Sequence, residues 1–87
     1  MDKKLEVMRK ESKTLDAQVI VGKNGLTEGT IKTIKDKLRT ERMVKVKILK
    51  TFIEENDKNE IFDELAEKCE AKVVHKLGFT ITLTKAL

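Results

Sequence analysis

The chain has 87 residues, of which 39% are hydrophobic and 39% charged. This length favours one domain over residues 1–87, because a second core could not bury enough apolar surface to offset its conformational entropy. No apolar run approaches the roughly 20 residues that span a bilayer, and the charged N-terminus lacks the apolar stretch of a signal peptide, so we expect a cytoplasmic protein without membrane contact. Cys69 is the single cysteine, which excludes an intramolecular disulfide and argues against a cysteine-based metal site.

Positive charge is concentrated in the first part of the chain, whose overall net charge is +4. Residues 1–50 contain 14 Lys and Arg against 7 Asp and Glu, whereas residues 51–87 contain 5 against 8. A polyanion-binding surface requires such an asymmetry, because neutralising phosphates and releasing their counterions supplies most sequence-independent affinity. Charge alone leaves nucleic-acid binding and an ordinary solvated surface equally open.

The first predicted elements are a helix and a strand. Residues 3–15 have helical periodicity, with one apolar stripe formed by Leu5, Met8, Ser12 and Leu15. Arg9 and Lys13 lie together on the flank of this helix. The short β-branched run from Ala17 to Gly22 is typical of an interior strand.

A glycine loop and a second helix follow that strand. The loop has the spacing G-x-x-G and consists of Gly22, Lys23, Asn24 and Gly25, residue types that tolerate turns and positive φ. Thr27 is suited to cap the next helix. One side of that helix is apolar, and its flank is basic, with Lys32, Lys35 and Arg39 at helical spacing.

The second half of the chain predicts two further strands after a third helix. Residues 43–50 alternate valine and isoleucine with lysine as a half-buried strand does, and residues 51–57 connect it to a helix capped by Asp57. The helix has an acidic outer side and an apolar side formed by Ile61, Phe62, Leu65 and Cys69. Residues 71–85 form a hairpin that turns near Gly78.

These elements give the order α-β-α-β-α-β-β, an α/β (α+β) fold. We expect a four-stranded mixed sheet with helices chiefly on one face. The other face should be partly open, because it would carry Lys45, Lys47, Thr80 and Thr82. At least two of the three phenylalanines, Phe52, Phe62 and Phe79, are expected in the core, so base stacking should contribute little to any nucleic-acid binding.

The sequence does not favour an enzyme. His75 is the single histidine and lies in a predicted strand, where a structural or surface role is commoner than catalysis or metal binding. Cys69 is expected to be a buried, inert thiol, and the acidic residues of the third helix lack the spacing of a calcium loop. We therefore predict no catalytic residue, metal or cofactor.

The glycine loop differs from the nucleotide-binding loops but suits a phosphodiester. It matches neither G-x-x-x-x-G-K-[ST] nor G-x-G-x-x-G. Lys23 lies within it, the next helix directs free N–H groups toward it, and the basic flank extends from it. Glycines let a phosphodiester approach the backbone closely, as in the G-x-x-G loop of KH domains, although that loop joins two helices. A plain turn between strand and helix is the alternative.

The sequence resembles the chloroplast RNA splicing and ribosome maturation (CRM) domain, including its small stand-alone prokaryotic members of the YhbY kind. The resemblance spans nearly the whole chain and is carried by "VGKNGLTEG" at residues 21–29, "MVKVKI" at residues 43–48 and Gly78. The family fold is similar to the C-terminal domain of bacterial translation initiation factor three. Members commonly have a proline before the first strand and a Tyr-Arg pair ending the last one, where this chain has "LDAQV", Thr84 and Lys85.

The resemblance implies RNA binding through the G-x-x-G loop and nearby basic residues. Stand-alone members associate with precursors of the large ribosomal subunit, so it implies ribosomal RNA as the partner. The expected RNA-binding residues are Gly22, Lys23, Asn24, Gly25, Lys32, Lys35, Arg39, Arg9 and Lys13. We expect a monomer that recognises the shape and backbone of structured RNA. Two alternatives are a DNA-binding or chromatin protein of the Alba kind and a ribosome-associated protein-interaction module.

Overall fold

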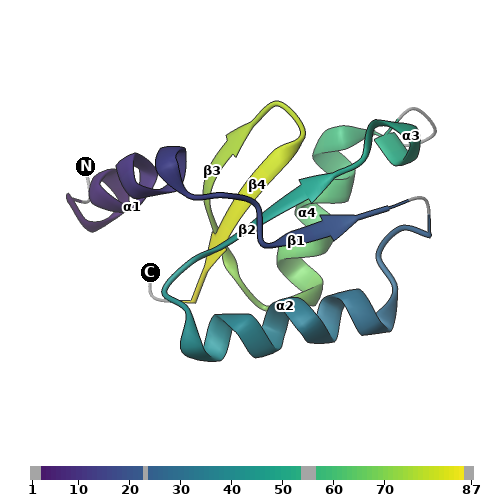
Figure 1. Cartoon of the computed structure of the whole chain (residues 1–87), viewed down its shortest axis with the longest axis horizontal. Coiled ribbons are helices and arrows are strands. Elements are labelled where there is room, and N and C mark those ends of the chain that lie inside the picture. Colours follow the sequence, from purple (N-terminus) through teal and green to yellow (C-terminus); the bar gives the residue numbers. More distant parts are fainter. Residues whose placement is uncertain (1–2, 23, 54–56, 86–87) are drawn as a thin grey trace.

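The computed structural model describes residues 3–22, 24–53 and 57–85 of the chain. Its elements follow in the order α1 (Lys3–Thr14), β1 (Val19–Val21), α2 (Glu28–Thr40), β2 (Val44–Ile48), α3 (Lys50–Ile53), α4 (Lys58–Lys68), β3 (Lys72–Leu77) and β4 (Thr80–Thr84) (Figure 1). The predicted order is confirmed, with one addition. The short helix α3 occupies part of the segment that was expected to be a plain connection, and residues 54–56 of that segment lie outside the described residues.

The strands form one mixed sheet in the order β1-β2-β4-β3. β1 and β2 are parallel and are joined through α2, whereas β4 runs antiparallel to both of its neighbours. Gly78 turns the β3–β4 hairpin with a φ of 58°, a left-handed conformation that glycine adopts without steric cost. The prediction of a four-stranded mixed sheet is therefore confirmed.

The expectation that Ala17 to Gly22 would form an interior strand was wrong, because β1 lies at the edge of the sheet. Val19 and Val21 enter the core, whereas Ile20 between them is 60% exposed on the other face. The run of consecutive apolar residues therefore forms a short edge strand beside an uncovered part of the sheet. A pattern of three residues cannot distinguish such an edge strand from an interior strand that is buried on both faces.

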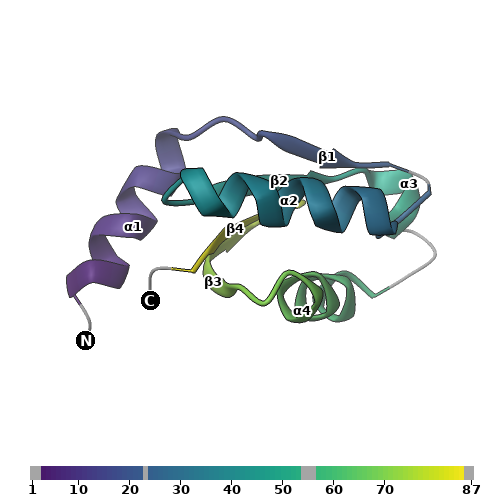
Figure 2. The same ribbon diagram turned by 90° about the horizontal axis from the view of Figure 1, so that it is seen from below.

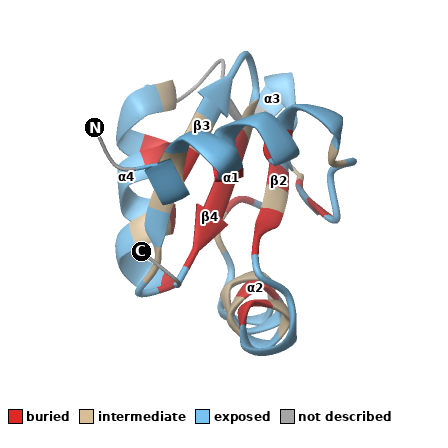
Figure 3. Ribbon diagram, turned by 90° about the vertical axis from the view of Figure 1, so that its left-hand side faces the viewer, coloured by how far each residue is buried: buried red, intermediate tan, exposed pale blue. Residues whose placement is uncertain are grey.

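The main core lies between the sheet and the two longer helices on one of its faces. α2 contributes Ile34 and Leu38, and α4 contributes the four apolar residues that the sequence predicted, Ile61, Phe62, Leu65 and Cys69. The sheet contributes inward-facing side chains from β1, β2 and β4. Figure 3 shows buried residues along β4 and on parts of β2. Because α2 and α4 pack into one cluster, their remaining surfaces are held next to each other.

α1 packs on the other side, where it forms a second, smaller cluster. Met8 is fully buried against Met43 and Val74, with Leu5 and Leu15 partly buried beside it. Figure 2 shows α1 at one end of the molecule, separate from α4. The predicted stripe of α1 is thus confirmed.

The second face of the sheet is only partly open. Lys47 is exposed as expected, but Thr82 is buried. Thr82 pairs with Lys45 on β2, and the Lys45 Nζ donates to the Ser12 carbonyl of α1 at 3.0 Å. The expected exposure of Thr82 was wrong because the end of α1 lies over this part of the face.

The aromatic residues are divided between core and surface. Phe62 is fully buried in the main core. Phe79 precedes β4 at the hairpin turn and is 41% exposed, with the Lys58 Nζ 6.0 Å from its ring centroid. The side chain of Phe52 lies outside the described residues. Whether two phenylalanines occupy the core therefore stays a prediction.

The end of α4 contains a strained residue. Glu70 has a φ of 54°, and it is the one non-glycine residue with positive φ in the described parts of the chain. The Ala71 N–H donates to the Ala66 carbonyl at 3.0 Å and the Glu70 N–H to the Glu67 carbonyl at 3.1 Å, which is the Schellman pattern that usually places glycine at this position.

We expect Glu70→Gly to raise the free energy of unfolding by about 0.5–1 kcal/mol. Glycine removes a left-handed penalty of about 1–2 kcal/mol, whereas the exposed ion pair that Glu70 forms with Lys35 contributes at most about 1 kcal/mol. The measurement is urea unfolding followed by circular dichroism. The matched control is Glu67→Gly inside α4, which should lower the free energy of unfolding by about 1 kcal/mol. Equal destabilisation by both substitutions would contradict the left-handed conformation of Glu70.

Candidate nucleic-acid interface

The glycine loop between β1 and α2 is a closed turn. The Gly25 N–H donates to the Gly22 carbonyl at 3.0 Å, and the Thr27 N–H donates to the Gly25 carbonyl at 3.1 Å. Gly25 is buried and has a φ of 73°, so a residue with a side chain would be strained there. Asn24 is exposed, and Lys23 lies outside the described residues. The turn presents its polar surface at the end of the molecule opposite α1 (Figure 1).

The loop leads directly into the N-terminus of α2. Thr27 is the N-cap, and its Oγ1 accepts the Thr30 N–H at 3.2 Å, as the sequence predicted. The Leu49 N–H donates to the Val21 carbonyl at 2.9 Å, so pairing with the segment after β2 continues to the last residue of β1, directly before the loop. The positive end of the α2 dipole adds a partial charge beside it.

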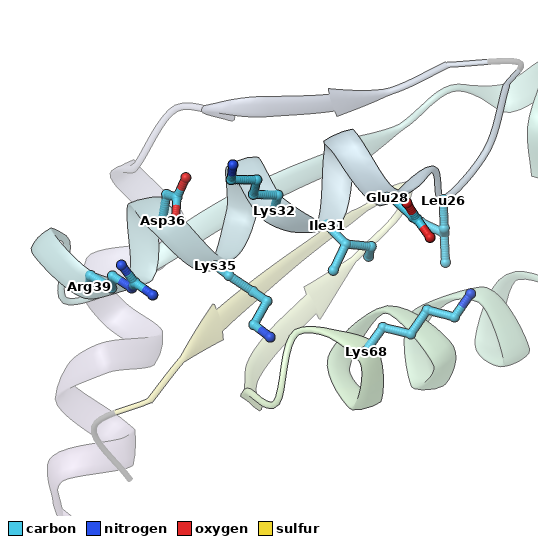
Figure 4. Close-up of a pocket in the computed structure, with 8 residues that line it drawn as sticks. All are labelled: Leu26, Glu28, Ile31, Lys32, Lys35, Asp36, Arg39 and Lys68. Atoms are coloured by element: carbon cyan, nitrogen blue, oxygen red, sulfur yellow. The ribbon is translucent and has the colours of Figure 1, made fainter.

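The predicted basic flank of α2 lines a groove between α2 and α4 (Figure 4). The groove has a volume of about 510 Å³, and its lining residues are Leu26, Glu28, Ile31, Lys32, Lys35, Asp36, Arg39 and Lys68. Ile31 and Lys35 extend from α2 toward α4, and Lys68 extends from α4 toward Leu26 and Glu28. Lys32 and Asp36 point away from α4. Four cationic side chains and two carboxylates thus line the groove, which leaves it positive.

Two of the four cations are paired, and two are available. Lys35 lies 3.4 Å from Glu70, and Lys68 lies 2.8 Å from Glu64. Over residues 3–22, 24–53 and 57–85, no carboxylate lies within ion-pair distance of Lys32 or Arg39. A bound anion could therefore reach Lys32 and Arg39 without displacing a carboxylate.

Arg9 and Lys13 are not brought to this groove. They lie on α1, at the end of the molecule away from the glycine loop (Figure 1). The Arg9 Nε donates to the Val74 carbonyl of β3 at 3.1 Å, so this side chain helps to hold α1 on the sheet. Lys13 is exposed. A contact of both residues with RNA stays a prediction, and it would need RNA that reaches beyond the loop and the groove.

Lys68 is a lining residue that the sequence analysis missed. It follows the apolar residues Ile61 and Leu65 by seven and three positions, so it lies on the side of α4 that faces α2. Glu60, Asp63, Glu64 and Glu67 of α4 and Glu70 beyond its end are all exposed as predicted, but two of them reach the groove cations, because Glu64 pairs with Lys68 and Glu70 with Lys35. The spacing of Lys68 from Ile61 and Leu65 was the signal that could have placed it beside α2.

The residues considered for catalysis or metal binding lie in ordinary structural positions. Cys69 is fully buried in the main core, and His75 is half-buried on β3, opposite Thr82. Within the described residues, no group of three or more His, Cys, Asp or Glu side chains is placed to hold a metal ion. The helices described in the structure include none that is long and apolar enough to cross a membrane.

The fold and these residues were compared with known proteins. The CRS1/YhbY (CRM) domain matches residues 1–85 of the chain. Probable RNA-binding protein MJ0652 of Methanocaldococcus jannaschii is 38% identical over 77 residues, which are 88% of this chain and 57% of that protein. Probable RNA-binding protein YqeI of Bacillus subtilis is 34% identical over 65 residues, which are 75% of this chain and 66% of that protein. The chain thus spans between somewhat over half and about two thirds of these relatives.

A solved structure has the same fold. The solution structure of SAV1595 from Staphylococcus aureus, a hypothetical protein described as a candidate for RNA binding, superposes with a TM-score of 0.78. The two chains are 27% identical, and the similarity covers 98% of this chain and 86% of the other. The predicted fold class is therefore confirmed by an independent structure.

We expect the Cys69 thiol to react with Ellman's reagent about tenfold or more slowly in the native protein than in urea. Burial raises the pKa of this thiol, although the charges of Lys35 and Lys85 oppose the shift, and the core also excludes the reagent. The folded protein keeps the thiol proton to a higher pH than the unfolded protein does. The free energy of unfolding should therefore fall once the pH rises above the ordinary pKa range of a thiol. Equal rates in native and unfolded protein would contradict the burial.

Proposed function

Because the chain belongs to the CRS1/YhbY (CRM) domain family, we propose that it is a non-catalytic RNA-binding protein that binds ribosomal RNA or its precursor during assembly of the large subunit. The loop of Gly22 to Gly25 and the basic flank of α2 would contact the RNA backbone. Such a protein would act in the cytoplasm, and as a monomer. The relatives that cover most of this chain are named as RNA-binding proteins, which supports RNA over DNA as the partner.

One observation carries the proposal: a closed glycine turn leads without interruption into a helix whose cations line one groove. A phosphodiester backbone has a charge at every nucleotide, so a binding surface needs cations repeated along a line. Lys32, Lys35 and Arg39 recur at helical spacing from the turn onward. Close approach at the turn is possible at Gly22, which is partly exposed and has no side chain, whereas the buried Gly25 supplies the positive φ of the turn.

The groove also explains why the acidic helix α4 is compatible with RNA binding. Lys68 extends from α4 into the groove, and its partner Glu64 and the Lys35 partner Glu70 are both exposed, so these ion pairs are weak. RNA that follows α2 would therefore meet cations from both helices and would be repelled from the outer side of α4. This separation of charge favours one orientation of the RNA on the protein.

Removal of the two available cations tests the basic flank. We expect the double variant Lys32→Ala/Arg39→Ala to weaken binding of a structured ribosomal RNA fragment at low salt, and to lower the salt slope of log K by about 0.7–0.9 for each lost phosphate contact. Fluorescence anisotropy at several salt concentrations gives both quantities. The matched control is Lys3→Ala/Lys10→Ala on α1, which removes the same charge at the other end of the molecule. An unchanged salt slope in the α2 variant would reject the flank as the contact.

Gly22→Ala tests the loop without breaking its turn. A Cβ at Gly22 would lie 3.7 Å from the Leu49 Cδ1, an ordinary contact, whereas any side chain at Gly25 would be strained by its positive φ. The added methyl group should obstruct a closely bound phosphodiester and weaken RNA binding about three- to tenfold, the equivalent of one ordinary hydrogen bond. An unchanged melting temperature would show that the fold is intact. Unaltered affinity in such a folded variant would make the loop a structural turn only.

A further inference from the structure

The groove between α2 and α4 has an apolar part that phosphate binding does not require. Leu26 and Ile31 line it and are only partly buried, although both also pack against the core. Leu26 directly follows Gly25, so this apolar part begins where the glycine loop ends. Exposed aliphatic surface gains nothing from contact with a phosphate group, but it is stabilised when a base or ribose covers it.

Lys35 and Lys68 border this apolar part, and because their partners Glu70 and Glu64 are exposed, both ion pairs are weak. In Figure 4, Lys68 from α4 reaches toward Leu26, and Lys35 from α2 points across the groove beside Ile31. A continuous RNA duplex presents phosphates and 2′-hydroxyl groups at its surface and keeps its bases stacked inside. An unpaired nucleotide presents a base, a ribose and a phosphate together. The mixed lining is therefore complementary to an unpaired nucleotide rather than to a duplex surface.

We propose that this groove holds one unpaired nucleotide of the bound RNA, with its base or ribose against Leu26 and Ile31 and its phosphates among the surrounding cations. The inference rests on the proposed function and specifies the RNA that the site selects, namely structured RNA with an unpaired nucleotide next to the segment held by the glycine loop. The volume of about 510 Å³ is in the range of clefts that bind small molecules, about 300–1,000 Å³.

The lining also indicates how selective the site is. Among the described residues, no aromatic side chain lines the groove, so stacking on one does not distinguish one base from another here. Glu28 and Asp36 are the lining carboxylates, and both lie on α2. We therefore expect a preference for an unpaired nucleotide over a paired one, with little dependence on which base it carries.

The test uses two RNA duplexes that contain one 2-aminopurine and differ only in whether this base has a partner in the other strand. The wild-type protein should bind the RNA with the unpaired 2-aminopurine about three- to tenfold more tightly, a difference that corresponds to burying a small aliphatic contact area. The fluorescence of the unpaired 2-aminopurine should also change on binding, because this base enters the groove. For the RNA with the paired base, little change in fluorescence is expected.

Lys68→Ala is the main variant, because it shortens an exposed side chain on α4 and leaves the core intact. It should reduce the preference for the unpaired nucleotide at least about twofold. Only the unpaired nucleotide enters the groove and brings its phosphate next to Lys68, so the loss of this cation weakens binding of that RNA more. Ile31→Ser should reduce it further, provided that its melting curve shows a folded protein. Leu77→Ser is the matched control, because Leu77 is 62% exposed on β3 outside the groove, and it should leave the preference unchanged.

The outcomes separate this inference from the proposed function. If the protein binds both RNAs equally well, or if Lys68→Ala and Leu77→Ser behave alike, the nucleotide site is wrong while RNA binding stands. If the protein binds neither RNA nor a ribosomal RNA fragment, both proposals are overturned. A preference for the unpaired 2-aminopurine that Lys68→Ala weakens and Leu77→Ser preserves would support the site.

Discussion

The packing of α2 and α4 into one core cluster is the interaction on which the candidate interface depends. Ile34 and Leu38 from α2 share this cluster with Ile61 and Leu65 from α4. Burial of each such side chain contributes about 1.5–3 kcal/mol, so the relative position of the helices is set by the strongest force in the fold. The groove is the surface left between the two helices beside this shared core.

Helical phase then decides which charges surround the groove. On α2, the positions next to the apolar stripe carry Lys32, Lys35 and Arg39, and on α4 the corresponding position carries Lys68. A chain with a modest net charge of +4 thus gains a groove in which four cations outnumber the two lining carboxylates, Glu28 and Asp36.

Much of this arrangement could be predicted from the sequence, because periodicity and capping residues are local signals. The apolar spacing of Ile61 and Leu65 and the caps Thr27 and Asp57 were sufficient to place the helices. The edge position of β1 and the location of α1 could not be predicted, since both depend on contacts between distant residues. The position of Lys68 beside α2 was predictable in principle from its spacing to Ile61 and Leu65. The many acidic residues around it in the sequence led instead to the prediction that this part of α4 is acidic.

The central claim is that RNA binds along the glycine loop and α2, and backbone NMR of the isotope-labelled protein during titration with a ribosomal RNA fragment tests it most directly. The account predicts that the largest chemical-shift changes occur at residues 22–39 and at Lys68, with small changes on the acidic outer side of α4. Changes confined to α1, or to the open face of the sheet around Lys47, would contradict it.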